Sequence, residues 1–169
     1  MSSAEPEAAE VPPIDSGEFR RVLGHFATGV TIITGMQGDQ PVGMAANSFT
    51  SVSLDPPFVL VCMARTSETW PLIQGSGAFA VNMLAEGQED VCRRFSAKGT
   101  DRFAGTGWEP AATGSPILRD SLAYVDCTIE VEHEAGDHVI VLGRVVDMGR
   151  LVDGRPLVFW RGGYGRLGD

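Results

Sequence analysis

The sequence has no long apolar run and no leader-like start. None of its apolar stretches approaches the roughly 20 residues that a membrane-spanning helix needs. Residues 1–10 are acidic and lack the basic, apolar and cleavage-site regions of a secretion signal. We therefore expect a cytoplasmic protein without a membrane partner.

Cysteine is scarce, with three residues in a chain of 169. Cys62, Cys92 and Cys127 are widely spaced among apolar neighbours, which predicts reduced, packed thiols. No CxxC pair indicates zinc, an iron–sulfur cluster or a redox dithiol. His133 and His138 are one residue too far apart for the i, i+4 pair of a zinc-protease helix, so we expect no metal site.

Positive charge is also scarce. Lys98 is the only lysine among 13 basic residues, and the net charge is -9. Five of the 22 acidic residues precede the first basic one, so the remaining chain is only mildly acidic. Neither a nucleic acid nor an anionic membrane is expected as a partner.

The common nucleotide and hydrolase motifs are missing. The chain has no GxxxxGK[ST] loop and no GxSxG elbow. The late glycines, Gly162, Gly163 and Gly165, do not form a GxGxxG that opens a helix. A phosphate-cradling loop of either standard type is therefore excluded.

The chain has the length of one domain, and 43% hydrophobic residues are enough to form a core. Residues 1–15 are predicted to be a disordered acidic extension, and 16–169 the folded domain. The Asp15-x-x-Glu18 spacing resembles a capping box. Apolar residues then follow at helical spacing, which predicts an amphipathic helix ending near Gly29: Phe19, Val22, Leu23 and Phe26.

Short apolar or β-branched runs follow, bounded by turns, as is typical of strands. The clearest is 124–133, where Val125, Cys127 and Val131 are expected to face the core and Asp126 the solvent. Further strands are expected at 30–34, 42–53, 58–63, 79–84, 139–146 and 156–161, and short helices at 68–73, capped by Ser67, and 88–95. This pattern predicts a mainly β fold, a small barrel or sandwich.

The segment 43–57 combines small and neutral polar side chains. Small residues let a flat ligand approach the backbone, and the amide and hydroxyl groups supply neutral donors and acceptors. This composition suits an uncharged heterocycle with polar edges. A Ser/Thr-rich strand edge without a ligand explains the same pattern equally well.

Five motifs, in one order, are shared with a known family. They are FATGVT at 26–31, ANSFTSVSLDPP at 46–57, FSxKxxDRFxG at 95–105, GDH at 136–138 and PLVFWRGGY at 156–164. From about Phe19 to Tyr164 the sequence resembles the short-chain flavin reductases of two-component monooxygenases. The resemblance implies a small FMN-binding split β-barrel with a few short helices.

The resemblance also implies an activity and partners. Such a protein is an NAD(P)H:flavin oxidoreductase, and it passes a hydride from NADH or NADPH to FAD or FMN. The reduced flavin then diffuses to a separate monooxygenase. The protein is expected to be a homodimer with its flavin sites near the subunit interface. The scarcity of lysine favours NADH, because a 2′-phosphate needs a cationic partner. The choice between FAD and FMN stays open.

By the same resemblance, several segments of the chain bind the cofactors, and the short turn at Ser67 and Thr69 binds the flavin phosphate. The cofactor-binding residues implied are Met44, Ala45, Ala46, Asn47, Ser48, Ser51, Val52, Ser53, Cys62, Met63, Ala64, Ser67, Thr69, Phe95, Ser96, Lys98, Trp160, Arg161, Gly162 and Gly163. Three of these have an alternative structural role. Ser67 also fits an ordinary helix cap, Phe95 the apolar face of its helix, and Trp160 a packed C-terminal strand.

His138 is the one residue for which the resemblance implies a catalytic contribution, near the nicotinamide. It follows a Gly-Asp turn, where structural histidines are also common. Two other functions remain open from the sequence. One is a non-catalytic flavin- or haem-binding module of the same fold. The other is an oxidase of the pyridoxamine-phosphate type, which the lone lysine disfavours because that type needs a basic phosphate cluster.

Overall fold

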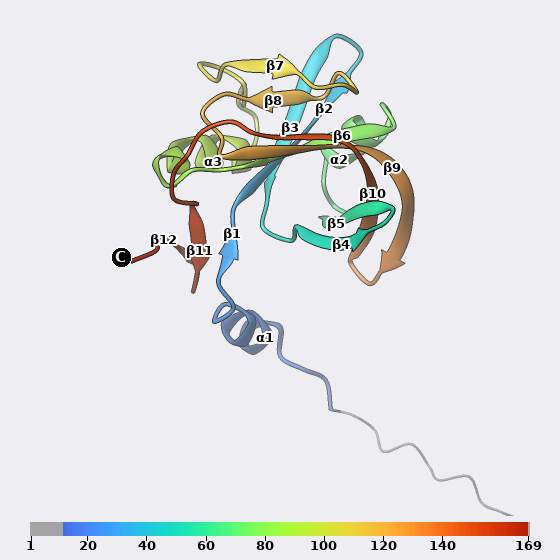
Figure 1. The fold of residues 1–169 in the computed structure, drawn as a ribbon. Coiled ribbons are helices and arrows are strands. Elements are labelled where there is room, and N and C mark those ends of the chain that lie inside the picture. Colours follow the sequence, from blue (N-terminus) through green and yellow to red (C-terminus); the bar gives the residue numbers. More distant parts are fainter. Residues whose placement is uncertain (1–11, 169) are drawn as a thin grey trace, which may run out of the picture.

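The computed structural model describes residues 12–168, and its main feature is a seven-stranded antiparallel sheet curled into a barrel (Figure 1). The edge strands are consecutive in the chain and do not pair with each other, so the barrel is split between them. The strands, in spatial order, are β3 (Gln40–Ala46), β2 (Thr31–Gln37), β6 (Ala78–Met83), β9 (Ala123–Ala135), β10 (His138–Arg150), β5 (Pro57–Ala64) and β4 (Thr50–Leu54).

Two smaller sheets and four short helices complete the fold. β1 (Thr28–Gly29), β11 (Val158–Trp160) and β12 (Gly163–Gly165) form a three-stranded sheet, and β7 (Trp108–Pro110) pairs with β8 (Pro116–Leu118). The helices are α1 (Ser16–Leu23), α2 (Trp70–Gln74), the 3₁₀ turn η1 (Glu86–Gln88) and α3 (Glu89–Ser96). No helix of the described part is long and apolar enough to cross a membrane.

Buried apolar side chains form two clusters, one on each side of β2. The larger fills the barrel, where Trp70 of α2 packs edge-on against Phe79 of β6. The smaller lies under α3 and includes Ile32, Phe95 and Leu157. Alternate residues of β2 point to opposite faces, so Ile33 enters the first cluster and Ile32 the second. Ala45 of β3 packs against the smaller cluster, whereas its neighbours Met44 and Ala46 pack against the larger one.

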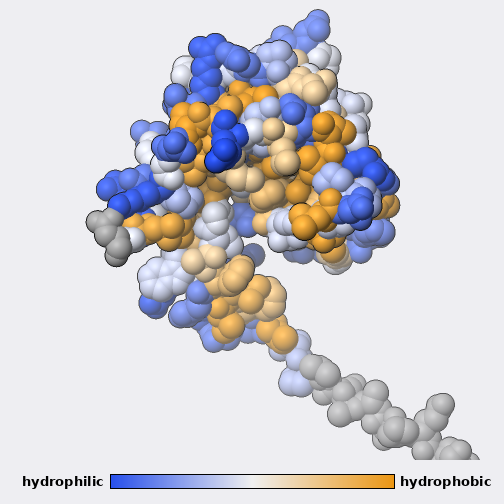
Figure 2. Space-filling view, in the orientation of Figure 1, coloured by the Kyte–Doolittle hydropathy of each residue, from blue (hydrophilic) through white to orange (hydrophobic). Residues whose placement is uncertain are grey.

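The first helix is shorter than predicted. It begins after Asp15, whose side chain accepts the N–H of Glu18, and it ends at Leu23 rather than near Gly29. The chain then turns and becomes extended in β1, because Thr28 and Gly29 pair with β11. α1 has no buried residue, and its apolar side forms a patch apart from the barrel (Figure 2).

The predicted alternation in 124–133 is right for Val125 and Cys127 and wrong for Asp126 and Val131. Val125 and Cys127 are buried as expected, but Asp126 is also fully buried. The loop before β8 covers its face of β9, and Thr113 donates to the Asp126 carboxylate through N–H and Oγ. Val131 is exposed, because β6 pairs with β9 only as far as Thr128.

Two other predicted boundaries are wrong. The strand region 42–53 is two strands, β3 and β4, because the chain crosses from one edge of the split sheet to the other between them. The helix expected at 68–73 is the five-residue α2, with Thr69 at its N-cap, although Ser67 Oγ does accept the N–H of Trp70. The expected disordered extension lies almost wholly outside the described residues, and residues 12–14 are exposed without regular structure.

Candidate active site

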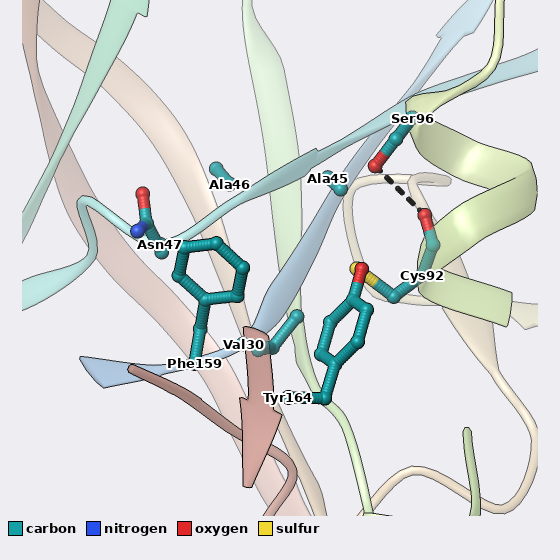
Figure 3. A pocket seen from close by; sticks show the side chains of 8 residues that line it. All are labelled: Val30, Ala45, Ala46, Asn47, Cys92, Ser96, Phe159 and Tyr164. Atoms are coloured by element: carbon teal, nitrogen blue, oxygen red, sulfur yellow. Dashed lines mark hydrogen bonds between the residues drawn. The ribbon is translucent and has the colours of Figure 1, made fainter. Parts of the chain in front are cut away.

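Three adjoining cavities form a groove along β3, and the central one has a volume of about 210 Å³ (Figure 3). Its floor is small, with Ala45 and Ala46 of β3. Cys92 and Ser96 of α3 line one side, while Phe159 of β11 and Tyr164 of β12 line the other. Val30 and Asn47 complete the lining.

The aromatic wall of the central cavity is held in place by polar and ring contacts. The Tyr164 hydroxyl donates to Cys92 Sγ over 3.2 Å, and its ring meets that of Phe159 edge-on at 5.7 Å. Burial and the neighbouring sulfur raise the pKa of Tyr164 to about 12, so it stays a neutral phenol. The wall therefore offers ring faces and edges without charge.

Asn47 and Ser48 lie where the chain leaves β3, and both also line a second cavity of about 500 Å³. Ser48 is fully engaged, because its Oγ donates to the Cys62 carbonyl and accepts the Cys62 N–H, both at 3.0 Å. The Asn47 side chain is exposed and makes no hydrogen bond within residues 12–168. Its amide is therefore available to a ligand.

The third cavity, of about 340 Å³, continues the groove from Ala45 and Ser96 toward the turn before α2. Its polar lining includes Ser67, Thr69 and Lys98, as the sequence predicted, together with Glu68. α2 is too short to act as a strong helix dipole, so hydroxyl groups and cationic side chains supply the attraction for an anion here. The full lining is Met44, Ala45, Ala64, Thr66, Ser67, Glu68, Thr69, Phe95, Ser96, Lys98, Gly99 and Arg102.

Arg102 also lines this cavity, although it is not among the predicted cofactor-binding residues. The sequence offers it, with Lys98 and Asp101, for steering phosphates or for an ion pair that fixes the loop. Its guanidinium donates to the carbonyls of Ala97 and Gly43 and to Thr69 Oγ1, over 2.7–2.9 Å. Asp101 does not pair with it and instead accepts the N–H of Phe103. The FSxKxxDRFxG motif contained the signal, an arginine four residues after Lys98.

Comparisons with known proteins decide the family. Residues 23–168 match the family model of the flavin reductase like domain. The chain belongs to the flavin-reductase-like family. It is 49% identical over 153 residues to HsaB, the reductase subunit of a flavin-dependent monooxygenase from Mycobacterium tuberculosis, with 89% of this chain and 82% of HsaB covered.

Solved structures agree with this family. Nitrilotriacetate monooxygenase component B from Mycobacterium thermoresistibile is 47% identical, with a TM-score of 0.88 over 90% of this chain and 86% of that one. The NADH:FAD oxidoreductase SgcE6 from Streptomyces globisporus, solved with NAD and FAD fragments, is 38% identical. Its TM-score is 0.84 over 95% of this chain and 98% of that one. The predicted family and its mainly β split barrel are thus confirmed.

The flavin-reductase groove gathers eleven of the residues predicted to bind cofactor. They come from β3 and the residues after it, the end of β5, the turn before α2, and α3: Met44, Ala45, Ala46, Asn47, Ser48, Ala64, Ser67, Thr69, Phe95, Ser96 and Lys98. The sequence prediction missed Val30, Cys92, Phe159 and Tyr164 in the central cavity. Phe159 and Tyr164 belong to the PLVFWRGGY motif, so the structure adds two further members of that motif to the lining.

Other predicted residues lie beside the groove and do not line its three cavities. Ser51, Val52 and Ser53 are on the edge strand β4, and Met63 is a core residue with no exposed surface. Trp160, Arg161, Gly162 and Gly163 form the β11–β12 turn, where Arg161 and Gly162 have positive φ. Cys62 contacts the site only through its backbone bonds to Ser48. The contribution of these residues to binding stays a prediction.

His138 begins β10 directly opposite Ala64, a residue of the third cavity. Its Nδ1 is 2.7 Å from Asp137 Oδ1, and the side chain is about half exposed. The histidine lowers the pKa of the Asp137 carboxyl group, which stays ionised and fixes the ring. Within residues 12–168, no three His, Cys, Asp or Glu side chains are grouped to hold a metal ion.

Proposed function

We propose that this protein is an NAD(P)H:flavin oxidoreductase that reduces free FAD or FMN for a separate flavin-dependent monooxygenase. One observation carries the proposal: a groove with an uncharged, small-residue centre leads to a hydroxyl-rich, cationic end. A flavin has the matching form, a flat heterocycle attached to a phosphate. Relatives named FMN reductase (NADH), NADH:FAD oxidoreductase and monooxygenase reductase subunit support the same activity.

The residues of the groove bind and orient, and the bound flavin supplies the hydride-accepting chemistry. Ala45 and Ala46 admit a ring close to the backbone of β3, and the Asn47 amide is free to bond its polar edge. Ser67, Thr69 and Lys98 receive the phosphate. Hydride transfer needs the reacting atoms held roughly 3–3.5 Å apart, so positioning is the main task of the protein.

His138 is assigned to the nicotinamide nucleotide. Ala64, its cross-strand neighbour, lines the groove, so a nucleotide entering over the flavin passes the imidazole. The ionised Asp137 carboxylate holds that ring from the other side. A histidine held in this way stacks on or hydrogen-bonds to the nucleotide and need not transfer a proton.

A homodimer is proposed because one apolar surface is exposed and a second is only partly covered. The first, the N-terminal apolar surface, comprises Phe19, Val22, Leu23 and Phe26, which are 51–77% exposed. The second is on the outer face of the barrel, where Cys62 lies opposite Ile140 and Leu60 opposite Leu142. A second copy buries both surfaces and closes the shallow groove, of which Phe26 already forms a border.

The decisive experiment measures NADH and NADPH oxidation with excess free FAD or FMN. Sustained turnover of free flavin is the expected result, with NADH preferred. The neutral ring site predicts weak to moderate binding, so dialysis should remove the flavin. NADH oxidation limited to one equivalent of non-exchanging flavin would instead indicate a flavin-binding module.

A further inference from the structure

The aromatic wall of the central cavity is the β11–β12 hairpin, residues 158–165, which carries Phe159 and Tyr164 (Figure 3). We propose that this hairpin is a gate for the flavin and that Tyr164 is the positioning residue that holds it closed against α3. The inference rests on the function proposed above, because a reductase that supplies a diffusible flavin must release it in every turnover. Three features of the hairpin support it.

The first feature is position. The central cavity, of about 210 Å³, is smaller than the two that it joins, of about 500 and 340 Å³. It shares Asn47 with the larger of them, and Ala45 and Ser96 with the other. A ligand that extends from the flat ring site to the hydroxyl-rich end therefore passes the hairpin. The floor and the opposite wall are fixed, because β3 belongs to the barrel and α3 buries Cys92 and Phe95.

The second feature is weak attachment. β11 pairs with β1 at two positions, and among the described strands β12 pairs with β11 alone. The base of the hairpin is fixed, since Leu157 is buried and its N–H donates to the Leu84 carbonyl. The turn is tied to the segment after α1, where the Arg161 N–H donates to the Gly24 carbonyl, and α1 has no buried residue. A segment that is fixed at one end and has few buried contacts beyond it opens at a low cost in free energy.

The third feature is the pair of contacts that Tyr164 makes with α3. Its hydroxyl donates to Cys92 Sγ over 3.2 Å, and the guanidinium carbon of Arg93 lies 5.0 Å from the centre of its ring. The sulfur is a weak acceptor, and the exposed Arg93 side chain keeps most of its hydration, so both contacts are weak. They close the hairpin without making it rigid, as a gate that opens in every turnover requires.

The hydroxyl of Tyr164 separates a gate from an ordinary ligand contact. Its one hydrogen is donated to Cys92 Sγ, so the phenol has no donor left for a flavin. Phe159, whose ring meets that of Tyr164 edge-on, has no polar group in its side chain. In this assignment the contacts of Tyr164 with α3 are present whether the site is empty or occupied. Loosening them should therefore change how fast a flavin enters and leaves, and not how tightly it is bound.

The test measures the association and dissociation rate constants of FMN by stopped-flow flavin fluorescence, without nicotinamide nucleotide. The variants are Tyr164→Phe, which removes the hydrogen bond to Cys92, and Arg93→Met, which removes the cation over the ring. We expect each variant to raise both rate constants by about two- to fivefold, the change that corresponds to one weak contact. The dissociation constant should stay unchanged, because entry and exit accelerate together.

Tyr124→Phe and Arg119→Met are the matched controls. Tyr124 also loses one hydroxyl bond, to Asp147, and Arg119 is as exposed as Arg93 and likewise pairs with a glutamate. Neither residue lines the three cavities of the groove, so neither variant should change either rate constant. If Tyr164→Phe weakened FMN binding through faster dissociation alone, the proposal would be overturned, because that result shows a direct contact. Unchanged rate constants in the folded Tyr164→Phe and Arg93→Met variants would overturn it too.

Hydrogen exchange on the wild type without flavin keeps the inference testable if the variants do not fold. The amides of residues 158–165 should exchange faster than those that pair β9 with β10, because the hairpin opens while the barrel stays closed. Equal protection of the two regions would overturn the gate. Loss of the proposed function is a separate outcome, because it would appear as absence of NAD(P)H oxidation by the wild type with every flavin.

Discussion

At the scale of single residues, His138 separates a binding role from a structural one. His138→Ala should raise the KM for NAD(P)H or lower the rate of reduction several-fold, while flavin affinity changes little. The reason is that its ring lies beside the groove at Ala64 and contacts none of the cavities assigned to the flavin. Two-substrate steady-state kinetics and melting curves measure both effects.

His133→Ala is the control for that experiment. His133 is exposed on β9, opposite Ile140, and should alter neither KM value. If His138→Ala lowers the melting temperature and leaves the nicotinamide kinetics intact, His138 only supports the β9–β10 turn.

The two tyrosines of the chain give a prediction for alkaline pH. The Asp147 acceptor raises the pKa of Tyr124, and burial with the Cys92 sulfur raises that of Tyr164 to about 12. Both phenols keep their protons in the folded state above the ordinary value of about 10. Their contribution to stability is complete below pH 10 and is lost as the pH rises toward 12.

Absorbance at 295 nm measures this directly. The folded protein should show little phenolate at pH 10, whereas the urea-unfolded chain should be about half ionised. Of the two tyrosine ionisations in the folded protein, Tyr164→Phe should remove the one that occurs at the higher pH. If both tyrosines of the folded protein ionised with a pKa of about 10, this result would contradict the burial of the aromatic wall.

At the scale of elements, the packing of β10 against β6 depends on Gly143. A Cβ atom there would lie 2.5 Å from Cζ of Phe79 and 3.1 Å from Cβ of Cys127. Gly143→Ala should therefore destabilise the barrel by about 1–3 kcal/mol through overpacking. Thermal unfolding measures the change. Gly165→Ala in β12 is the control, because its Cβ would have no neighbour within 4 Å.

The elements also show what the sequence can predict. Periodicity and turn residues identify most strands of the barrel and α3, because those signals are local, but they join β3 to β4 and do not indicate β7 or β8. The burial of Asp126 depends on a distant segment, because Thr113 donates hydrogen bonds to its carboxylate from a loop 13 residues away. Ser67 and Thr69 were implied by the family resemblance, and the structure places both in the lining of the third cavity. The hydrogen bonds of Arg102 to Gly43 and Thr69 could not be predicted, because only the folded chain brings these residues together.

At the scale of the whole molecule, the exposed N-terminal apolar surface predicts a dimer in solution. Sedimentation velocity should show two copies, and Phe19→Ser with Leu23→Ser should weaken the dimer at least tenfold. The circular dichroism of the barrel should stay unchanged, because α1 has no buried residue. A wild-type monomer with full turnover would exclude a role for the second copy in the site.

The aromatic wall has a consequence for biosynthesis. The floor of the central cavity comes from residues 45–47, but its wall comes from Phe159 and Tyr164, on a hairpin that pairs with β1. A ribosome makes the floor early and the wall more than a hundred residues later. The complete flavin site therefore cannot exist while the chain is still emerging. It can capture its ligand only after Tyr164 has left the exit tunnel.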